Sequence, residues 1–229
     1  MKILVTESQY KKLLKEEEKE QKIFRVPDMK FFHEDRWEAW KILQKVLEAR
    51  GNPPYTIDGD LDLSDTSIES LGNLISVGGD LDLRWTQIKS LGNLTSVSGD
   101  LDLYGTSIKS LGNLQSVGGY LDLRYTPIKS LGNLTSVGGN LDLENSPIKS
   151  LGNLTTVGGD LVLYKTPIKS LGNLQSVGDS LDLMRTSIES LGNLTSVGGD
   201  LDLKYTPLSE KYTEDQIRQM VKVGGDIFL

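Results

Sequence analysis

A 20-residue unit repeats along most of this chain. Seven tandem copies run from Gly59 to Gly198 without an insertion or a deletion; the first reads GDLDLSDTSIESLGNLISVG and the last reads DSLDLMRTSIESLGNLTSVG. Apolar residues recur at six fixed positions of every copy, and one copy is too short to bury them alone. Coils stacked on one another would bury them in a continuous column, so the repeat predicts a solenoid.

The strand of each unit is its L-D-L segment. Leu61 and Leu63 alternate with the outward Asp62, and the equivalent segments recur every 20 residues. We expect these segments to stack about 4.8 Å apart as one parallel sheet. The aspartates, together with positions 64 and 65 and their equivalents, should project from its outer side. The pairs Gly72-Asn73 and Gly78-Gly79 mark corners of the coil.

Two polar columns accompany the repeat. A hydroxyl column follows the strand at Thr66, Thr86, Thr106, Thr126, Ser146, Thr166, Thr186 and Thr206. An amide column stands at Asn73, Asn93, Asn113, Asn133, Asn153, Asn173 and Asn193. We expect both columns to bond backbone groups that the turns leave unpaired.

The run L-x-L-x-x-T-x-I-x-x-L resembles the core motif of leucine-rich repeat proteins, with Thr in the usual Asn position and Gly72 where short bacterial repeats often carry Pro. The run NLTSVGGDLDL is also similar to receptor L-domains and to repeat proteins of bacteria and their phages. The resemblance covers roughly residues 55–229. It implies a right-handed α/β-solenoid, mainly β, that binds a ligand or partner, and it brings no catalytic residue. The departures from the usual motif favour a straight solenoid over a curved horseshoe.

Segments with a different pattern flank the repeats and are expected to cap the exposed ends of the core. We divide the chain into a helical N-terminal segment and cap (1–54), the solenoid (55–208) and a last repeat with a helix and a final strand (209–229). Helical spacing over 34–49 places Trp37 and Trp40 on the first coil. A partly mobile helix is expected around residues 10–22. Thr213 to Gln216 form a capping-box pattern that opens the C-terminal helix.

Composition argues against an enzyme. The 229 residues include no cysteine and a single histidine, His33, which we read as a surface residue. A disulfide framework, a thiolate metal site and a cysteine nucleophile are therefore excluded, and a histidine relay is disfavoured. We predict no catalytic residue, no metal site and no cofactor.

Charge and hydropathy bear on location and partners. The net charge of −7 argues against nucleic acid as a partner. The only apolar run near the start, Ile3 to Val5, is too short for a signal peptide, and no run approaches a membrane span. We expect a cytoplasmic protein without a membrane partner, virion-associated if the gene belongs to a phage.

An aspartate follows the first strand leucine in most units. This column comprises Asp62, Asp82, Asp102, Asp122, Asp142, Asp182 and Asp202, with Val162 interrupting it. Carboxylates one coil apart repel each other by roughly 0.9 kcal/mol even in bulk water. Either nearby Arg and Lys side chains offset the repulsion, which we favour, or cations are shared between neighbouring carboxylates.

The two positions after each strand vary most between copies, and nearly all exposed aromatic and arginine side chains of the repeats fall there. These residue types dominate interface hot spots. We therefore predict a partner-binding strip, whose candidate residues are Arg84, Trp85, Tyr104, Arg124, Tyr125, Tyr164, Arg185 and Tyr205. A row of lysines on another side, from Lys89 to Lys169, is the competing surface.

Two classes of function remain. The first is a non-catalytic recognition module that binds a protein partner on the strip. The second is a structural or assembly component of a particle or fibre, with contacts through the solenoid ends. Phe228 replaces the column aspartate in the last strand, so we name it as a possible homo-oligomer contact at the C-terminal edge. An ordered Thr array could also bind ice, but we expect the Thr column to face inward.

Overall fold

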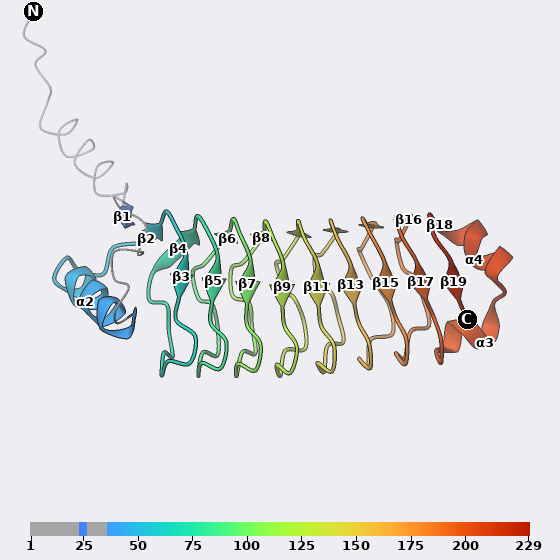
Figure 1. Ribbon diagram of the computed structural model, residues 1–229, viewed down its shortest axis with the longest axis horizontal. Helices are drawn as coiled ribbons and strands as arrows, with labels where there is room; N and C mark the ends of the chain where they lie inside the picture. Colours follow the sequence, from blue (N-terminus) through green and yellow to red (C-terminus); the bar gives the residue numbers. More distant parts are fainter. Residues whose placement is uncertain (1–22, 27–35) are drawn as a thin grey trace, which may run out of the picture.

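The structure, a computed structural model, describes residues 23–26 and 36–229 (Figure 1). Parallel strands wind into a straight solenoid, and helices lie at both of its ends. Each 20-residue repeat adds one coil and keeps the register without a shift, so that Leu61 pairs with Leu81 and Leu81 with Leu101. The predicted solenoid with helical caps is therefore confirmed.

The prediction of one sheet was wrong, because the described residues form two. The first has ten strands: β1 (Phe24–Val26), β2 (Tyr55–Ile57), β4 (Leu74–Val77), β6 (Ser96–Val97), β8 (Ser116–Val117), β10 (Ser136–Val137), β12 (Thr156–Val157), β14 (Ser176–Val177), β16 (Ser196–Val197) and β18 (Lys222–Val223). Most of these strands are two residues long, with one outward hydroxyl and one inward valine. Because a two-residue segment shows no detectable alternation, its sequence predicts no strand.

The second sheet is the one that the L-D-L segments predicted. Within the described ranges it has nine strands: β3 (Leu61–Asp62), β5 (Leu81–Asp82), β7 (Leu101–Asp102), β9 (Leu121–Asp122), β11 (Leu141–Asp142), β13 (Leu161–Val162), β15 (Leu181–Asp182), β17 (Leu201–Asp202) and β19 (Ile227–Phe228). The leucines point inward and the aspartates project from the outer side, as expected.

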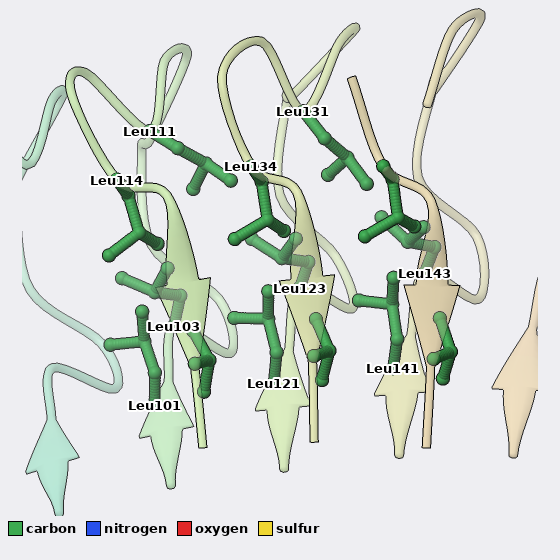
Figure 2. Close-up of a cluster of buried hydrophobic side chains, with 14 of the residues drawn as sticks. Leu101, Leu103, Leu111, Leu114, Leu121, Leu123, Leu131, Leu134, Leu141 and Leu143 are labelled. Atoms are coloured by element: carbon green, nitrogen blue, oxygen red, sulfur yellow. The ribbon is translucent and has the colours of Figure 1, made fainter. Parts of the chain in front are cut away.

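The core is a set of leucine, isoleucine and valine columns between the sheets. Figure 2 shows leucines of successive coils stacked with their side chains pointing in the same direction. Leu103, Leu114 and Ile108 and their equivalents in the central coils have no exposed surface. Burying a Leu or Ile side chain contributes about 1.5–3 kcal/mol, so this periodic core is the main source of stability.

The threonine column faces inward and closes the turn after each strand of the nine-stranded sheet. Thr86 is buried, and both its N–H (3.2 Å) and its Oγ1 (2.7 Å) donate to the Leu83 carbonyl. Ser146 Oγ and Thr166 Oγ1 are buried without a partner among the described residues. The hydroxyl column therefore serves the turns and is not presented to a ligand.

Helix α2 (Arg36–Glu48) caps the N-terminal end of the solenoid. Trp40, Leu43 and Leu47 are buried in the core cluster, and Trp37 packs against it. Below the helix, the buried Tyr55 hydroxyl donates to the Leu71 carbonyl at 2.7 Å. The prediction that tryptophans cover the first coil is confirmed. The helix expected around residues 10–22 and His33 lie outside the described residues.

Two short helices, α3 (Pro207–Lys211) and α4 (Glu214–Met220), replace the arc of the last coil. The predicted capping box is present, with Thr213 as the N-cap and Gln216 as its partner. Helix α3 was not predicted; its N-cap is Thr206, the last member of the threonine column. From α4, the Arg218 guanidinium donates to the Val223 (3.2 Å) and Gly225 (3.0 Å) carbonyls. Leu208 and Ile217 close the core at this end.

Candidate functional site

The variable strip consists of the two residues that follow each L-D-L segment, from Ser64-Asp65 to Lys204-Tyr205. Its second position has a left-handed backbone in every repeat, with φ between 55° and 67°. The residues there are Asp65, Trp85, Gly105, Tyr125, Asn145, Lys165, Arg185 and Tyr205. Because the next residue bonds back to the strand, each strip side chain stands on a closed, regular turn.

Several residues on the strip are poorly suited to this backbone. Glycine, asparagine and aspartate tolerate positive φ, whereas bulky side chains in this region are outliers. Trp85 (φ 59°), Tyr125 (φ 56°) and Tyr205 (φ 59°) adopt it nevertheless. Strained positions that the surrounding structure maintains are concentrated at functional sites, so this outlier pattern marks the strip as a candidate site.

Three of the predicted residues form one aromatic cluster: Trp85, Tyr104 and Tyr125. The ring centroids of Trp85 and Tyr104 are 5.0 Å apart, and those of Tyr104 and Tyr125 are 5.4 Å apart, both edge to face. Trp85 and Tyr125 are each 56% exposed. The Trp85 ring occupies the space above Gly105, where a Cβ atom would lie 2.6 Å from two ring carbons. The absence of a side chain at Gly105 is therefore what lets this ring lie down against Tyr104.

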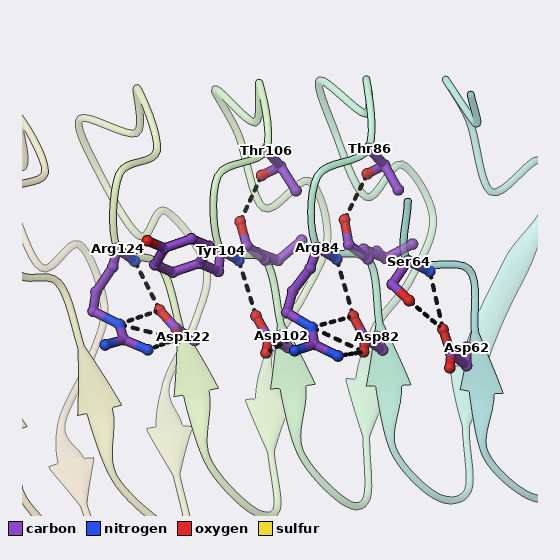
Figure 3. Close-up of polar contacts among 12 residues, drawn as sticks. Asp62, Ser64, Asp82, Arg84, Thr86, Asp102, Tyr104, Thr106, Asp122 and Arg124 are labelled. Atoms are coloured by element: carbon purple, nitrogen blue, oxygen red, sulfur yellow. Dashed lines mark hydrogen bonds and ion pairs between the residues drawn. The ribbon is translucent and has the colours of Figure 1, made fainter. Parts of the chain in front are cut away.

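Arg84 and Arg124 turn back from the strip to the aspartates of their own strands (Figure 3). The Nε of Arg84 is 3.0 Å from both carboxylate oxygens of Asp82 and 3.4 Å from Asp102. Arg124 repeats this geometry with Asp122, and its guanidinium also lies 5.2 Å from the centre of the Tyr104 ring. These two arginines therefore support the sheet face and the aromatic cluster in addition to bordering the surface.

The remaining predicted residues form a second, smaller group. Arg185 donates weakly to the Tyr164 hydroxyl at 3.4 Å, and its guanidinium is 5.5 Å from the centre of the Tyr205 ring. Lys165 lies 4.8 Å from the centre of the Tyr164 ring. Tyr205 is 73% exposed. The repeat with Glu144 and Asn145 separates this group from the aromatic cluster, so the strip does not form one continuous aromatic surface.

Beside the aromatic cluster, the sheet carries an acidic groove of about 320 Å³. Its lining residues are Asp60, Leu61, Asp62, Asp80, Leu81, Asp82, Asp100 and Asp102. Three of them belong to a second aspartate row, one position before each strand, which was not among the predicted columns. The visible signal was the recurring D in V-G-G-D-L-D-L.

The second row forms a ladder with the backbone of the next coil. Asp60 Oδ1 accepts the Asp80 N–H at 3.0 Å, and Asp80 Oδ1 accepts the Asp100 N–H at 2.8 Å. Asn140 makes the same bond to the Asp160 N–H at 2.8 Å. The ladder needs an oxygen at this position and not a negative charge.

The first aspartate row, which includes Asp102 and Asp142, is electrostatically stressed. Burial raises the pKa of Asp102, and the charges of Asp122 and Asp82 raise it further. Burial likewise raises the pKa of Asp142 and of Asp182. Neighbouring arginines offset part of this repulsion, as expected. Among the described residues, no group of three acidic or histidine side chains has a geometry that could hold a metal ion.

The competing surface and the C-terminal edge lie elsewhere. Lysines 89, 109, 129, 149 and 169 are exposed, and Lys169 pairs with Glu189 at 2.8 Å. Phe228 on β19 pairs with Asp202, and the Lys204 ammonium lies 4.3 Å from the centre of its ring. That cation–π contact gives Phe228 a role within its own chain, and its part in oligomer contacts stays a prediction.

Comparison with known proteins gives no further guide. The sequence matches no family model, no curated protein and no solved structure. Within the described ranges, every helix falls short of the length and apolarity that a bilayer crossing requires.

Proposed function

We propose that this protein is a non-catalytic recognition module that binds a protein partner on the variable strip, with the aromatic cluster at the centre of the contact. The observation that carries the proposal is the cluster itself, in which Tyr104 contacts both Trp85 and Tyr125. Trp85 and Tyr125 are more than half exposed, and both have a left-handed backbone that is unfavourable for bulky side chains. We also propose a kinship with leucine-rich repeat proteins, which the L-x-L-x-x-T-x-I motif supports.

Two physical arguments support binding at this place. Trp and Tyr offer large contact area with few rotatable bonds, so little entropy is lost when they are covered. Here the rings are already fixed against one another and against Arg124. The turns that carry them follow the strands of a parallel sheet and are hydrogen-bonded from coil to coil, as in the bond from the Trp85 N–H to the Tyr104 carbonyl at 3.1 Å. A preformed surface of this kind favours binding, because little ordering entropy opposes it.

Selection from a random peptide display library tests the proposal and requires no identified partner. Peptides enriched on the unmodified protein should bind the Trp85→Ala/Tyr125→Ala variant at least tenfold more weakly. The Lys109→Ala/Lys129→Ala variant is the matched control and should bind them unchanged. Loss of binding on the lysine variant, or failure to enrich any peptide, would contradict the proposal.

Size-exclusion chromatography with light scattering separates this proposal from the assembly alternative. A recognition module should elute as a monomer at all concentrations. A particle or fibre component should form larger species, and Phe228→Asp should reduce them if the C-terminal edge makes the contact. Concentration-dependent assembly with no display ligand at the cluster would favour the structural function.

A further inference from the structure

The charge on the sheet face is distributed unevenly along the solenoid. In the three repeats from Asp60 to Gly105, the two aspartate rows and the strip together carry seven carboxylates and one guanidinium, that of Arg84. The same positions in the three repeats from Asp160 to Tyr205 carry four carboxylates and three cationic groups. The acidic excess therefore lies at one end, and it is the end that holds the aromatic cluster.

The acidic groove and the aromatic cluster belong to the same strands. Asp82 and Arg84 flank the last leucine of the β5 segment, and Trp85 follows directly; Asp102 and Tyr104 have the same relation on the next coil. Within the described part of the chain, neither Asp80 nor Asp100 forms an ion pair, and both residues are exposed. A ligand lying across these coils would meet carboxylates on one side and aromatic faces on the other.

We propose, as an inference that rests on the proposed function, that the partner presents a basic, extended segment. The Arg or Lys side chains of this segment enter the acidic groove, and its neighbouring residues cover the aromatic cluster. Carboxylates and aromatic faces together bind guanidinium and ammonium groups through ion pairs and cation–π contacts. The groove spans three strands, or about 10 Å, which is the length of roughly three extended residues. Two basic residues of one segment can therefore occupy it together.

Two other occupants fit the observations less well. A bare metal ion is disfavoured because the described carboxylates do not converge on one point. A small polyamine would satisfy the charges but would leave the exposed rings of Trp85 and Tyr125 uncovered. A polypeptide supplies both the cations and the apolar surface.

The test uses calorimetric titration of the full chain with a nine-residue peptide of alternating Arg and Ser. Its counterpart of alternating Glu and Ser, and spermine, are the reference ligands. We expect the Arg peptide to bind, the Glu peptide not to bind, and spermine to bind at least tenfold more weakly than the Arg peptide. Trp85→Ala/Tyr125→Ala, which changes no charge, should weaken binding of the Arg peptide about tenfold.

A matched pair of charge variants locates the site. Asp80→Asn/Asp100→Asn and Asp160→Asn/Asp200→Asn each remove two charges from the second aspartate row. Asn140 shows that asparagine maintains the ladder. The first variant should bind the Arg peptide at least tenfold more weakly than the unmodified protein does, and the affinity of the second should stay within twofold of the unmodified protein. Circular dichroism confirms that both remain folded.

The outcomes separate this inference from the proposed function. Equal losses in the two charge variants, or spermine binding as tightly as the peptide, would show that net charge alone attracts the ligand, and the inference would be wrong. No binding of the Arg peptide would overturn it as well. In each case, display-selected peptides that depend on Trp85 and Tyr125 would leave the proposed function standing.

Discussion

Asp122 is almost completely enclosed, and its ion-pair partner is Arg124, two residues further along the same strand end. The Asp122 side chain is 2% exposed, and the Nε of Arg124 lies 3.1 and 3.0 Å from its two carboxylate oxygens. The Arg124 N–H donates to the same carboxylate at 2.9 Å. At the equivalent pair two coils earlier, the Asp82 side chain is 21% exposed. The same arginine–aspartate geometry thus occurs once around a buried carboxylate and once around a partly exposed one.

This difference predicts unequal effects of removing the arginine. Arg124→Ala leaves a buried carboxylate without its ion-pair partner and should lower the free energy of unfolding by about 3–5 kcal/mol. Arg84→Ala leaves a carboxylate that water can reach and should cost about 1 kcal/mol. Urea denaturation followed by circular dichroism measures both. Equal losses would show that burial of Asp122 does not determine the strength of the pair.

The left-handed strip position predicts a stabilising substitution. Lys165 has φ 55°, and the equivalent residue of the preceding repeat is Asn145, which tolerates this conformation. Lys165→Asn should therefore raise the free energy of unfolding by about 1 kcal/mol, despite the loss of the Lys165 contact with Tyr164. Lys149→Asn, at an exposed position outside the strip, is the control and should change little. A lower midpoint for Lys165→Asn would contradict the strain argument.

Two corner glycines with the same backbone predict a purely steric contrast. Gly132 and Gly152 have φ 59° and 60°, so alanine is strained at both. A Cβ atom on Gly152 would lie 2.4 Å from the Gly132 carbonyl oxygen, whereas one on Gly132 meets nothing within 4 Å. Gly132→Ala should cost about 1 kcal/mol of stability, and Gly152→Ala about 1–3 kcal/mol more. Thermal unfolding of the two variants provides the comparison, and the idea fails if their midpoints coincide.

Asp142 predicts a pH dependence of defined sign. Burial raises its pKa in the folded state, so the folded chain takes up this proton before the unfolded chain does. Its penalty is therefore absent below the unfolded pKa of about 3.9 and develops as the pH rises through the folded pKa. Asp142→Asn, which keeps an acceptor for the Glu144 N–H, should be more stable than the unmodified protein at pH 7 and equal to it near pH 3.

The control for this titration is Asp200→Asn, at an exposed position of the second aspartate row. Unfolding free energies measured from pH 3 to 8 should show a gap between Asp142→Asn and the unmodified protein that widens with pH, and the Asp200→Asn series shows what the same exchange does at an exposed position. A gap that is constant across the range would exclude ionisation as its cause.

The sequence predicted the features that show alternation within a repeat or a helix-capping pattern. Leu61, Leu63 and their equivalents alternate strongly enough to define one sheet and the core, and Thr213 with Gln216 was sufficient to define α4. The ten-stranded sheet was not predicted, because two residues such as Ser96-Val97 cannot show alternation. The left-handed strip position escaped because only Gly105, Asp65 and Asn145 hint at it, and the other residues there favour right-handed backbone.

Some of the structure has no counterpart in the sequence period. The arcs bridge in pairs, with Ser90 to Ser110, Ser130 to Ser150 and Ser170 to Ser190, although the segment S-L-G-N-L is the same in every copy. This alternation has no counterpart in the residues of the arcs. It cannot be seen in any one of them.

The Trp85 ring lying over Gly105 joins two coils into one structural unit, and the same two coils are bridged at Ser90 and Ser110. A tryptophan placed on one coil thus requires an empty position on the next. For protein engineering, the transplantable cassette is therefore a block of forty residues and not a single repeat. Moving Trp85 without the glycine that follows it would force the indole upright and break up the surface that it was meant to carry.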